Sequence, residues 1–290
     1  MKEAASKSEA WGYEAVWAAD RIIIPWEIKT TYPYSADQKF IVPPDRPFLE
    51  PLTCLAFLAG CTTKISLGIS VLVLPYRHPL YWTKVVATID QLSRGRFILG
   101  LGVGWMEEEF RALEVSFSDR GARSDEQLEI LKELWEKDRS RFKGRFYSFD
   151  DVASNPKPYQ RPRLPIWIGG EGLRAQRRVA TYGDTWFPYF VTITPKELVA
   201  RFDNIRRLAR AAGREADSIR LACCLPVEVT SEPVPQVEGR LMGHPEQLVA
   251  ALKGYEKAGV QHLSLQFMTP RWPDRLEQME RFAREVLPAF

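Results

Sequence analysis

The fold is indicated most directly by residues 97–109, FILGLGVGWMEEE, which begin as an apolar run and end in glutamates. Phe97 to Leu101 has the unbroken apolar character of a strand that is buried on both faces. Glycines then alternate with larger residues up to Gly104. Three glutamates, Glu107 to Glu109, suit the first turn of a helix, where carboxylates complement the helix dipole. A buried strand that passes through a tight turn into a helix is the repeating unit of parallel α/β proteins.

The same alternation extends along the rest of the chain. Short apolar or β-branched runs predict seven strands, at 13–19, 65–74, 97–101, 165–168, 185–187, 219–229 and 260–267. Between them, apolar residues at helical spacing predict helices around 52–59, 80–92, 128–135, 198–212, 248–255 and 276–286. This order indicates an α/β protein with a parallel sheet, either a (β/α) barrel or a doubly wound sheet.

A TIM-type (β/α)8 barrel needs eight strands, and the sequence supplies seven. Ala4, Ser8 and Trp11 fit one helix face, so the chain opens in a helix that should pack on a preceding strand. We therefore expect a barrel that lacks its first strand, either because the start codon is assigned late or because the barrel is open there. Residues 1–290 are expected to form a single barrel domain with long loops at 21–47 and 143–163, and such loops are often lids or binding loops.

Composition excludes several classes of function. The chain is 45% hydrophobic and 27% charged, which suits a globular protein, and its net charge of +3 argues against a nucleic acid or a membrane surface as partner. The longest apolar run, Ile65 to Pro75, is shorter than the roughly 18 residues of a membrane span. The N-terminus has no signal-peptide pattern, so a cytoplasmic location is expected.

Histidine and cysteine provide no local metal motif, and no metal site is expected. His78, His244 and His262 lie far apart in sequence and suit helix starts or packing. The four cysteines are spaced as in neither a zinc knuckle nor a redox pair, and are expected to be buried, reduced thiols.

Two glycine-rich strand ends are candidate ligand sites. Gly102 and Gly104 would let a planar ligand approach the backbone, with an ordinary tight turn from strand to helix as the alternative. A dinucleotide site is a weaker alternative, because G-x-G-x-G lacks the third glycine of the Rossmann fingerprint. Near Pro165–Leu173, exposed amides at a helix start predict an anion site, with a plain turn as the alternative. Glu171 in this loop would repel the anion, so the site would rely on backbone donors.

A charged pair follows the first predicted strand. Asp20 and Arg21 come directly after Trp17–Ala19, at the end of the strand where barrel active sites lie. A surface ion pair between the two is the simpler interpretation. The run 67–75, LGISVLVLP, has the pattern of a buried strand and nothing more.

Taken together and in this order, seven strings resemble the bacterial luciferase-like monooxygenase superfamily, and especially its branch that uses the deazaflavin coenzyme F420. They are GYEAVWAADR (12–21), EPLTCLAFLAGCTTKISLGISVLVLPYRHP (50–79), QLSRGRFILGLGVGWMEEEF (91–110), RGARSDEQLEILKELW (120–135), PIWIGGEG (165–172), GDTWFP (183–188) and GHPEQLVAALKGYEKAGVQHL (243–263).

The resemblance implies a barrel whose flavin or deazaflavin lies at the carboxyl ends of the strands. It implies a non-prolyl cis peptide at Ser70-Val71, which backs the ring. It also implies that the cofactor phosphate is held by the loop Gly169, Gly170, Glu171, Gly172 and Leu173, in agreement with the anion site inferred above.

The chain departs from the family pattern at two positions. In deazaflavin dehydrogenases of this type a histidine follows the aspartate that matches Asp20, and a glutamate lies near the position of Trp105; this chain has Arg21 and Trp105 there. Arg21 is a candidate to stabilise an anionic ring or substrate, and Trp105 a candidate wall of the substrate pocket. Asp20, Arg21 and Trp105 are therefore the candidate catalytic residues.

The function implied is hydride transfer between F420 and a small organic substrate held beneath the loop 21–47. Two alternatives remain: an FMN-dependent monooxygenase that uses reduced flavin and O2, supplied by a partner reductase, and a non-catalytic flavin-binding relative. A homodimer is expected, with the apolar helices 49–61 and 80–92 as the pairing surface.

Overall fold

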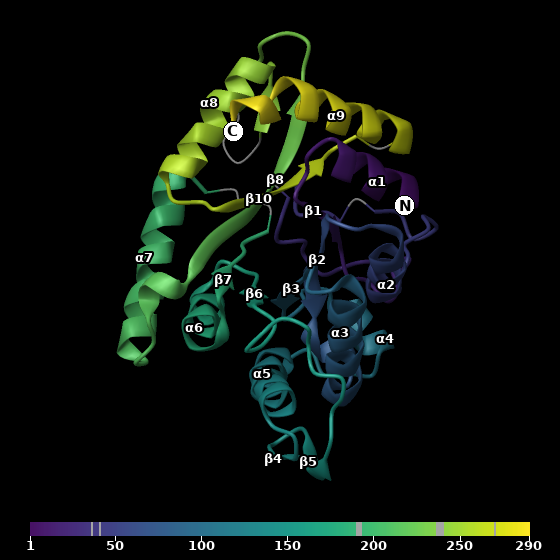
Figure 1. Cartoon of the computed structure of the whole chain (residues 1–290), viewed down its shortest axis with the longest axis vertical. Helices are drawn as coiled ribbons and strands as arrows, with labels where there is room; N and C mark the ends of the chain where they lie inside the picture. The colour runs from purple at the N-terminus through teal and green to yellow at the C-terminus, as the bar shows by residue number, and fades with distance from the viewer. Residues whose placement is uncertain (36, 41, 190–192, 236–240, 270) are drawn as a thin grey trace. The chain divides into compact units, whose positions relative to one another are not determined.

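The structure is a computed structural model that describes residues 1–35, 37–40, 42–189, 193–235, 241–269 and 271–290 (Figure 1). It contains two compact units. One consists of Trp17–Ile166, and the other of Met1–Val16 together with Trp167–Phe290. The sequence-based prediction of one domain over 1–290 stays a prediction.

The unit Trp17–Ile166 carries the first three barrel strands. Its elements are β1 (Ala15–Ala18, of which the last two residues belong here), α2 (Pro51–Cys61), β2 (Ser66–Val73), the 3-10 turn η1 (Leu74–Tyr76), α3 (Pro79–Ser93), β3 (Phe97–Gly102), α4 (Glu107–Ala112), α5 (Arg120–Glu136), β4 (Ser140–Lys143) and β5 (Ser148–Val152). In the sheet, β1 lies beside β2 and β2 beside β3. Leu67, Ile69, Leu72, Leu99 and Leu101 are almost completely buried and form the centre of its core.

The pairing of β2 with β3 contains one irregularity. The strands are parallel, with Ile69 opposite Leu99 and Leu72 opposite Leu101, so β2 has one residue more than β3 in this interval. That extra residue makes a bulge at Ser70 and Val71, and bulges commonly lie next to functional sites. The peptide bond between these two residues is cis, as the family resemblance implies.

Helix starts in this unit follow from local chemistry. The Glu50 carboxylate caps α2 by accepting the Thr53 amide, and Nδ1 of His78 accepts the Leu80 amide at the start of α3, with a proline in the first turn of each helix. Trp82 on α3 is fully buried and donates its indole N–H to Oε1 of Gln127 on α5, at 2.8 Å. The expectation that His78 serves at a helix start is confirmed.

The other unit continues the alternation of strands and helices. Its elements are α1 (Lys2–Ala10), β6 (Ile166–Ile168, from its second residue), α6 (Leu173–Tyr182), β7 (Thr185–Trp186), α7 (Pro195–Ala211), η2 (Ala216–Ser218), β8 (Arg220–Val229), β9 (Leu241–Gly243), α8 (Pro245–Lys257), β10 (His262–Phe267), α9 (Trp272–Glu285) and η3 (Leu287–Ala289). Strands β6, β7, β8 and β10 pair in parallel in that order, and β9 pairs in parallel with the last three residues of β8. Tyr13, after α1, stacks on Phe282 of α9 and donates its hydroxyl to the carbonyl of Met279.

All seven predicted strands are present, as β1, β2, β3, β6, β7, β8 and β10, so the predicted fold class is confirmed. Residues 21–47 carry no helix or strand at any described position, as expected. The prediction of a loop over 143–163 is wrong in part, because β4 and β5 form an antiparallel hairpin that enters it. This hairpin has charged residues at positions where a strand pattern would show apolar ones.

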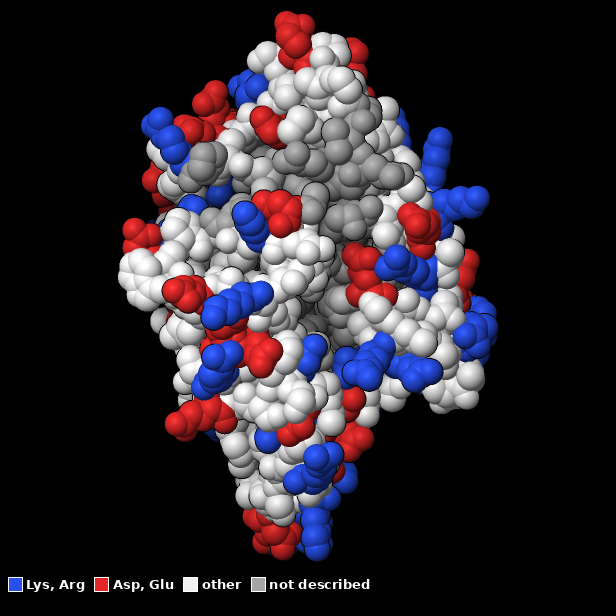
Figure 2. All heavy atoms as spheres, turned by 180° about the vertical axis from the view of Figure 1, so that it is seen from behind, with Lys and Arg blue, Asp and Glu red and all other residues white. Residues whose placement is uncertain are grey.

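Two other properties bear on the sequence-based expectations. None of the four cysteines forms a disulfide; Cys223 and Cys224 are buried as expected, whereas Cys54 and Cys61 on α2 are only partly buried. Within the described ranges, no helix combines the length and apolar character needed to cross a membrane. On the face shown in Figure 2, basic and acidic side chains are interspersed, in keeping with the net charge of +3.

Candidate functional site

The bulge of β2 is partly exposed, although the strand is buried on both sides of it. Ser70 and Val71 are both partly exposed, whereas the three residues on each side of them, 67–69 and 72–74, are buried. On the neighbouring strand, Gly102 is partly exposed, and so are the three residues that follow it, up to Trp105. The bulge of β2 and the end of β3 therefore present a small, largely apolar surface toward the carboxyl edge of the sheet, where barrel active sites lie.

The glycines of β3 are required by this bulge. A Cβ on Gly102 would lie 2.4 Å from Cγ2 of Val71, and a Cβ on Gly100 would lie 2.3 Å from the carbonyl oxygen of Ile69. Glycine at both positions thus lets the bulged strand lie close against β3. Gly104 has a φ of +80°, and a Cβ there would collide with Phe110. The space above Gly102 is filled by Val71, so this glycine supports the surface and its direct contact with a cofactor stays a prediction.

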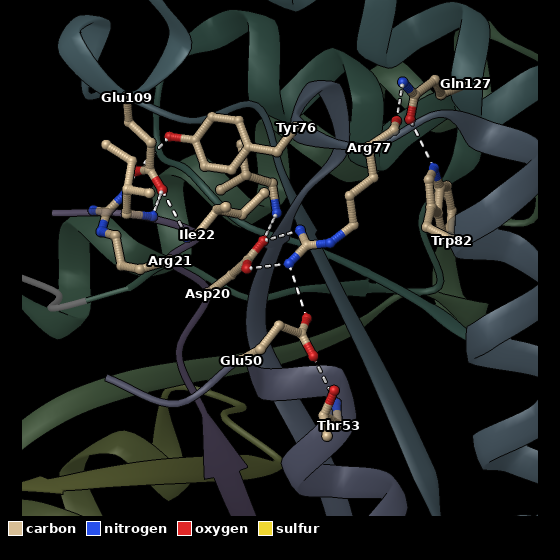
Figure 3. A network of polar contacts seen from close by, with 12 residues as sticks. Asp20, Arg21, Ile22, Glu50, Thr53, Tyr76, Arg77, Trp82, Glu109 and Gln127 are labelled. Atoms are coloured by element: carbon tan, nitrogen blue, oxygen red, sulfur yellow. Dashed lines mark hydrogen bonds and ion pairs between the residues drawn. The ribbon is translucent and has the colours of Figure 1, made fainter. Parts of the chain in front are cut away.

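Asp20 lies at the end of β1 in a fully satisfied environment (Figure 3). It is buried, and its two carboxylate oxygens accept hydrogen bonds from Nη1 and Nη2 of Arg77, each at 2.8 Å. Oδ2 also accepts the backbone N–H of Val73 at 2.8 Å. Two parallel N–H···O bonds to a guanidinium are a strong, geometrically specific arrangement. Asp20 therefore ties the end of β1 to the end of β2.

Arg77 extends this network to the start of α2. Its Nη2 also donates to Oε1 of Glu50 at 3.0 Å, while Oε2 of Glu50 accepts the Thr53 amide at 2.7 Å (Figure 3). Burial alone would raise the pKa of Glu50, but the Thr53 hydrogen bonds and the charge of Arg77 outweigh it, and the pKa lies below its usual value. Glu50 therefore serves at once as helix cap and as partner of Arg77.

Arg21 pairs with a buried glutamate and not with Asp20. Its Nη1 donates to Oε2 of Glu109 at 2.8 Å, and the hydroxyl of Tyr76 donates to the same oxygen at 2.8 Å (Figure 3). The other oxygen of Glu109 accepts the backbone amides of Ile22 and Ile23, at 2.8 and 3.3 Å. Glu109 is 0% exposed, so all four donors act on a carboxylate removed from water.

Two sequence-based interpretations change as a result. A surface ion pair between Asp20 and Arg21 is wrong, because both are buried and each has a different partner. The three glutamates do lie in the first turn of α4, as expected, but Glu109 is an organising residue of the site and not merely a complement to the helix dipole. Its partners lie up to 88 residues away, and no local pattern in the sequence indicates them.

Aromatic rings cover Arg21. Its guanidinium carbon lies 4.9 Å from the ring centre of Trp105 and 5.1 Å from that of Phe40, and Tyr32 packs on Trp105 at 4.9 Å. Glu109 on one side and aromatic faces on the other leave Arg21 only 8% exposed. Its charge is thus compensated within the protein, whereas the residue Trp105 is partly exposed.

Glu108 holds the next part of the loop in the same way. Its carboxylate accepts the backbone amides of Lys29 and Thr30, at 2.7 and 3.0 Å, and the Thr30 hydroxyl at 2.7 Å. Partial burial would raise the pKa of Glu108, but the hydrogen bonds from Thr30 and Lys29 outweigh it, and the pKa is lowered. Two adjacent carboxylates of α4 therefore fasten the loop that follows β1.

The predicted anion-binding loop lies in the other compact unit, before α6. The helix begins at Leu173 after Gly172, with no side chain capping its first turn. Glu171 pairs with Arg201 at 2.7 Å, so its charge is compensated. Burial raises the pKa of Glu171, and the attraction of Arg201 opposes that rise. The repulsion expected between Glu171 and an anion is thereby reduced.

Side chains hold the backbone of this loop in place. The indole N–H of Trp186 donates to the carbonyl of Gly170 at 2.8 Å, and Nε2 of Gln176 donates to the carbonyl of Glu171 at 2.9 Å. Gly170 has a φ of +91°, a conformation that favours glycine. The backbone conformation therefore accounts for the glycine at position 170. Gly169 lies immediately before it, directly after β6.

Comparison with known proteins gives the family. Residues 1–234 match the family model of the luciferase-like monooxygenases. The chain belongs to that family. The resemblance inferred from the sequence is confirmed, and members of this luciferase-like family are oxidoreductases and monooxygenases.

Individual members of the luciferase-like family are similar to the chain to different degrees. An uncharacterised protein of Mycobacterium tuberculosis is 32% identical over 210 residues, which are 72% of this chain and 71% of that protein. The FMNH2-dependent dimethylsulfone monooxygenase of Pseudomonas putida is 34% identical over 191 residues, 64% of this chain but only 49% of that enzyme. The coenzyme F420-dependent tetrahydromethanopterin reductase of Methanopyrus kandleri, a solved structure, is 18% identical with a TM-score of 0.77 over 100% of this chain and 94% of its own, which shows a shared fold.

Seven of the candidate residues lie in one unit: Asp20 and Arg21 beyond the end of β1, Ser70 and Val71 on the bulge within β2, and Gly102, Gly104 and Trp105 at or beyond the end of β3. The candidates from Gly169 to Leu173 lie in the other. Among the described residues, no group of three or more histidine, cysteine, aspartate or glutamate side chains is placed to hold a metal ion.

Proposed function

We propose that this luciferase-like protein is an oxidoreductase that transfers a hydride between the deazaflavin coenzyme F420 and a small organic substrate. The observation that carries the proposal is the partly exposed pair Ser70–Val71, on a bulge between buried stretches of β2 and beside the partly exposed end of β3. When bound, the deazaflavin supplies a ring carbon that accepts or releases hydride. The protein's part is to hold and orient that ring.

The residues of this surface suit the apolar face of a flat ring. Val71 offers an aliphatic face that lies against the glycines of β3, and Ser70 offers a hydroxyl with no hydrogen bond to any side chain or backbone group of the described chain. The nearby charges are already paired, Asp20 with Arg77 and Arg21 with Glu109. We propose that Val71 supports the ring and that the Ser70 hydroxyl is available to donate a hydrogen bond to it.

Asp20, Arg21 and Trp105 have distinct proposed roles. Asp20 acts as a positioning residue, because both its oxygens are used by Arg77 and Val73. Arg21 also acts by position, since its charge is compensated by Glu109. Trp105, which is partly exposed, is the proposed wall of the substrate pocket.

We further propose that the first turn of α6 holds the cofactor phosphate. The uncapped amides after Gly172 are suitable donors, and the positive end of the helix dipole favours an anion. Pairing of Glu171 with Arg201 reduces the repulsion between the Glu171 carboxylate and a bound phosphate.

A second candidate function is an FMN-dependent monooxygenase that receives reduced flavin from a partner reductase. It is favoured by the 34% identity to the FMNH2-dependent enzyme of Pseudomonas putida. The same ring-supporting surface would serve flavin. A non-catalytic flavin-binding protein is the remaining alternative.

Cofactor binding separates these functions. The protein is titrated with F420 and with FMN, and binding is followed by the ligand's fluorescence and by the melting temperature, which rises because a ligand at one hundred times its dissociation constant stabilises by about 2.7 kcal/mol. We expect F420 to bind more tightly. Tight FMN binding without F420 binding would favour the monooxygenase, and binding of either cofactor with no turnover over a broad substrate panel would favour the non-catalytic alternative.

We also propose a homodimer formed through α2 and α3. Helix α2 contains no charged residue, and it exposes Thr53, Phe57 and Gly60 at helical spacing. Tyr81 and Leu92 on α3 are exposed as well. A two-fold interface brings identical surfaces together, and an uncharged stripe does so without repulsion. Light scattering at micromolar concentration should give twice the monomer mass, and Phe57→Glu should halve it; a monomeric wild type would contradict the proposal.

A further inference from the structure

The segment after Arg21 exposes a run of apolar side chains. Residues 22–26, IIIPW, contain no polar side chain apart from the indole N–H. Ile22 and Ile23 are each 38% exposed, and Trp26 is 83% exposed. A contiguous exposed apolar segment commonly marks a site where another molecule binds.

The backbone of this segment is fixed. The amides of Ile22 and Ile23 donate to the fully buried Glu109, and a few residues further on Lys29 and Thr30 donate to Glu108. Both glutamates belong to α4, which follows β3. Since β2 lies between β1 and β3, the segment runs from the end of β1 past the end of β2, the strand that carries Ser70 and Val71. The exposed isoleucines are therefore held at a defined place beside the proposed ring surface.

The electrostatics of this region disfavour a charged ligand. Arg21, the only ionisable side chain within residues 21–26, is compensated by Glu109, and Asp20 is compensated by Arg77. Beyond Trp26, Glu27 and Lys29 are both exposed and opposite in sign. An uncharged apolar ligand would gain from burial against the segment, whereas a charged one would lose its hydration without finding a partner.

We infer that Ile22–Trp26 is the substrate-recognition wall and that the substrate is an uncharged, largely hydrocarbon molecule. The inference rests on the proposed function, because it places this substrate beside the cofactor ring. It adds two elements: the class of substrate, and a role for Glu109 as the residue that positions the wall.

The test uses the full-length protein with its cofactor bound. Straight-chain 2-alkanones from butanone to undecanone serve as probes, together with 10-oxoundecanoate and its methyl ester, and their affinities are measured by displacement of Nile red. The affinity should rise about fourfold with each added methylene, the factor that corresponds to 0.8 kcal/mol. The carboxylate should bind at least tenfold more weakly than its neutral ester.

Variants locate the effect on the wall. Trp26→Ala and Ile23→Ser should each reduce the affinity for undecanone at least fivefold, and should leave the dissociation constant of F420 within twofold of the wild-type value. Trp272→Ala, which removes another exposed tryptophan, is the matched control and should change neither.

Equal affinity for carboxylate and ester, no dependence on chain length, or equal loss in Trp272→Ala would overturn the inference even if F420 binds as proposed. Failure of both F420 and FMN to bind would instead refute the proposed function, whatever the alkanones do.

Discussion

Replacing Glu109 with glutamine tests the organisation of the site at its most buried point. Glu109 is 0% exposed and accepts Arg21, Tyr76 and the amides of Ile22 and Ile23. The substitution keeps the shape of the side chain but leaves the guanidinium buried without its counter-charge. Loss of one partner of a buried ion pair costs about 3–5 kcal/mol, and we expect the free energy of unfolding to fall by that amount.

Urea unfolding followed by circular dichroism measures this change. Glu107→Gln is the matched control, since Glu107 lies in the same helical turn but is exposed, and it should change the stability by no more than about 0.5 kcal/mol. Adding Arg21→Met to Glu109→Gln removes both charges, so the double variant should lose less than the sum of the single losses. A cost for Glu109→Gln within about 1 kcal/mol of the control, or strict additivity, would refute the proposed pairing.

Three further predictions concern other parts of the molecule. Gly102→Ala would place a methyl carbon 2.4 Å from Val71, so we expect a loss of about 1–3 kcal/mol in stability and at least a tenfold weaker F420 affinity by fluorescence titration; unchanged affinity would separate the bulge from the cofactor site. Arg201→Ala should leave Glu171 without its counter-charge beside α6 and weaken F420 binding about tenfold, and adding Glu171→Gln should restore the affinity; an F420 affinity that Arg201→Ala leaves unchanged would contradict a phosphate site at this helix start. Burial lowers the pKa of His262, so below about pH 6.5 the unfolded chain binds more protons than the folded one and stability falls; His262→Phe should flatten the melting temperature between pH 7 and 5, and parallel profiles would contradict this.

The fold could be predicted because its strands carry their own signal. Runs such as 65–74 and 219–229 are apolar throughout, and a strand buried on both faces requires that pattern. The hairpin β4–β5 lacks the pattern, because Arg141, Asp150 and Asp151 lie in solvent and the strands bury little. β9 reads Leu-Met-Gly, with neither a β-branched nor an aromatic residue, so its sequence carries no strand signal.

The site could be predicted only where local sequence determines it. The family resemblance indicated Ser70–Val71, and the position after β1 indicated Asp20 and Arg21. The partners of those residues could not be predicted, because Arg77 and Glu109 reach them through the fold, 57 and 88 residues away. Positions 107, 108 and 109 all hold glutamate, so the sequence does not distinguish them. Only the packing of α4 leaves Glu107 exposed and Glu109 fully buried.

Direct titration of the protein with F420 tests the central claim, that the bulge of β2 supports a deazaflavin ring. The change in deazaflavin fluorescence should saturate at one F420 per chain, and Val71→Asp, which puts a carboxylate on the ring-supporting surface, should abolish saturation while Glu107→Gln leaves it intact. Saturable binding that is indifferent to Val71→Asp, or no binding of F420 at all, would contradict the account.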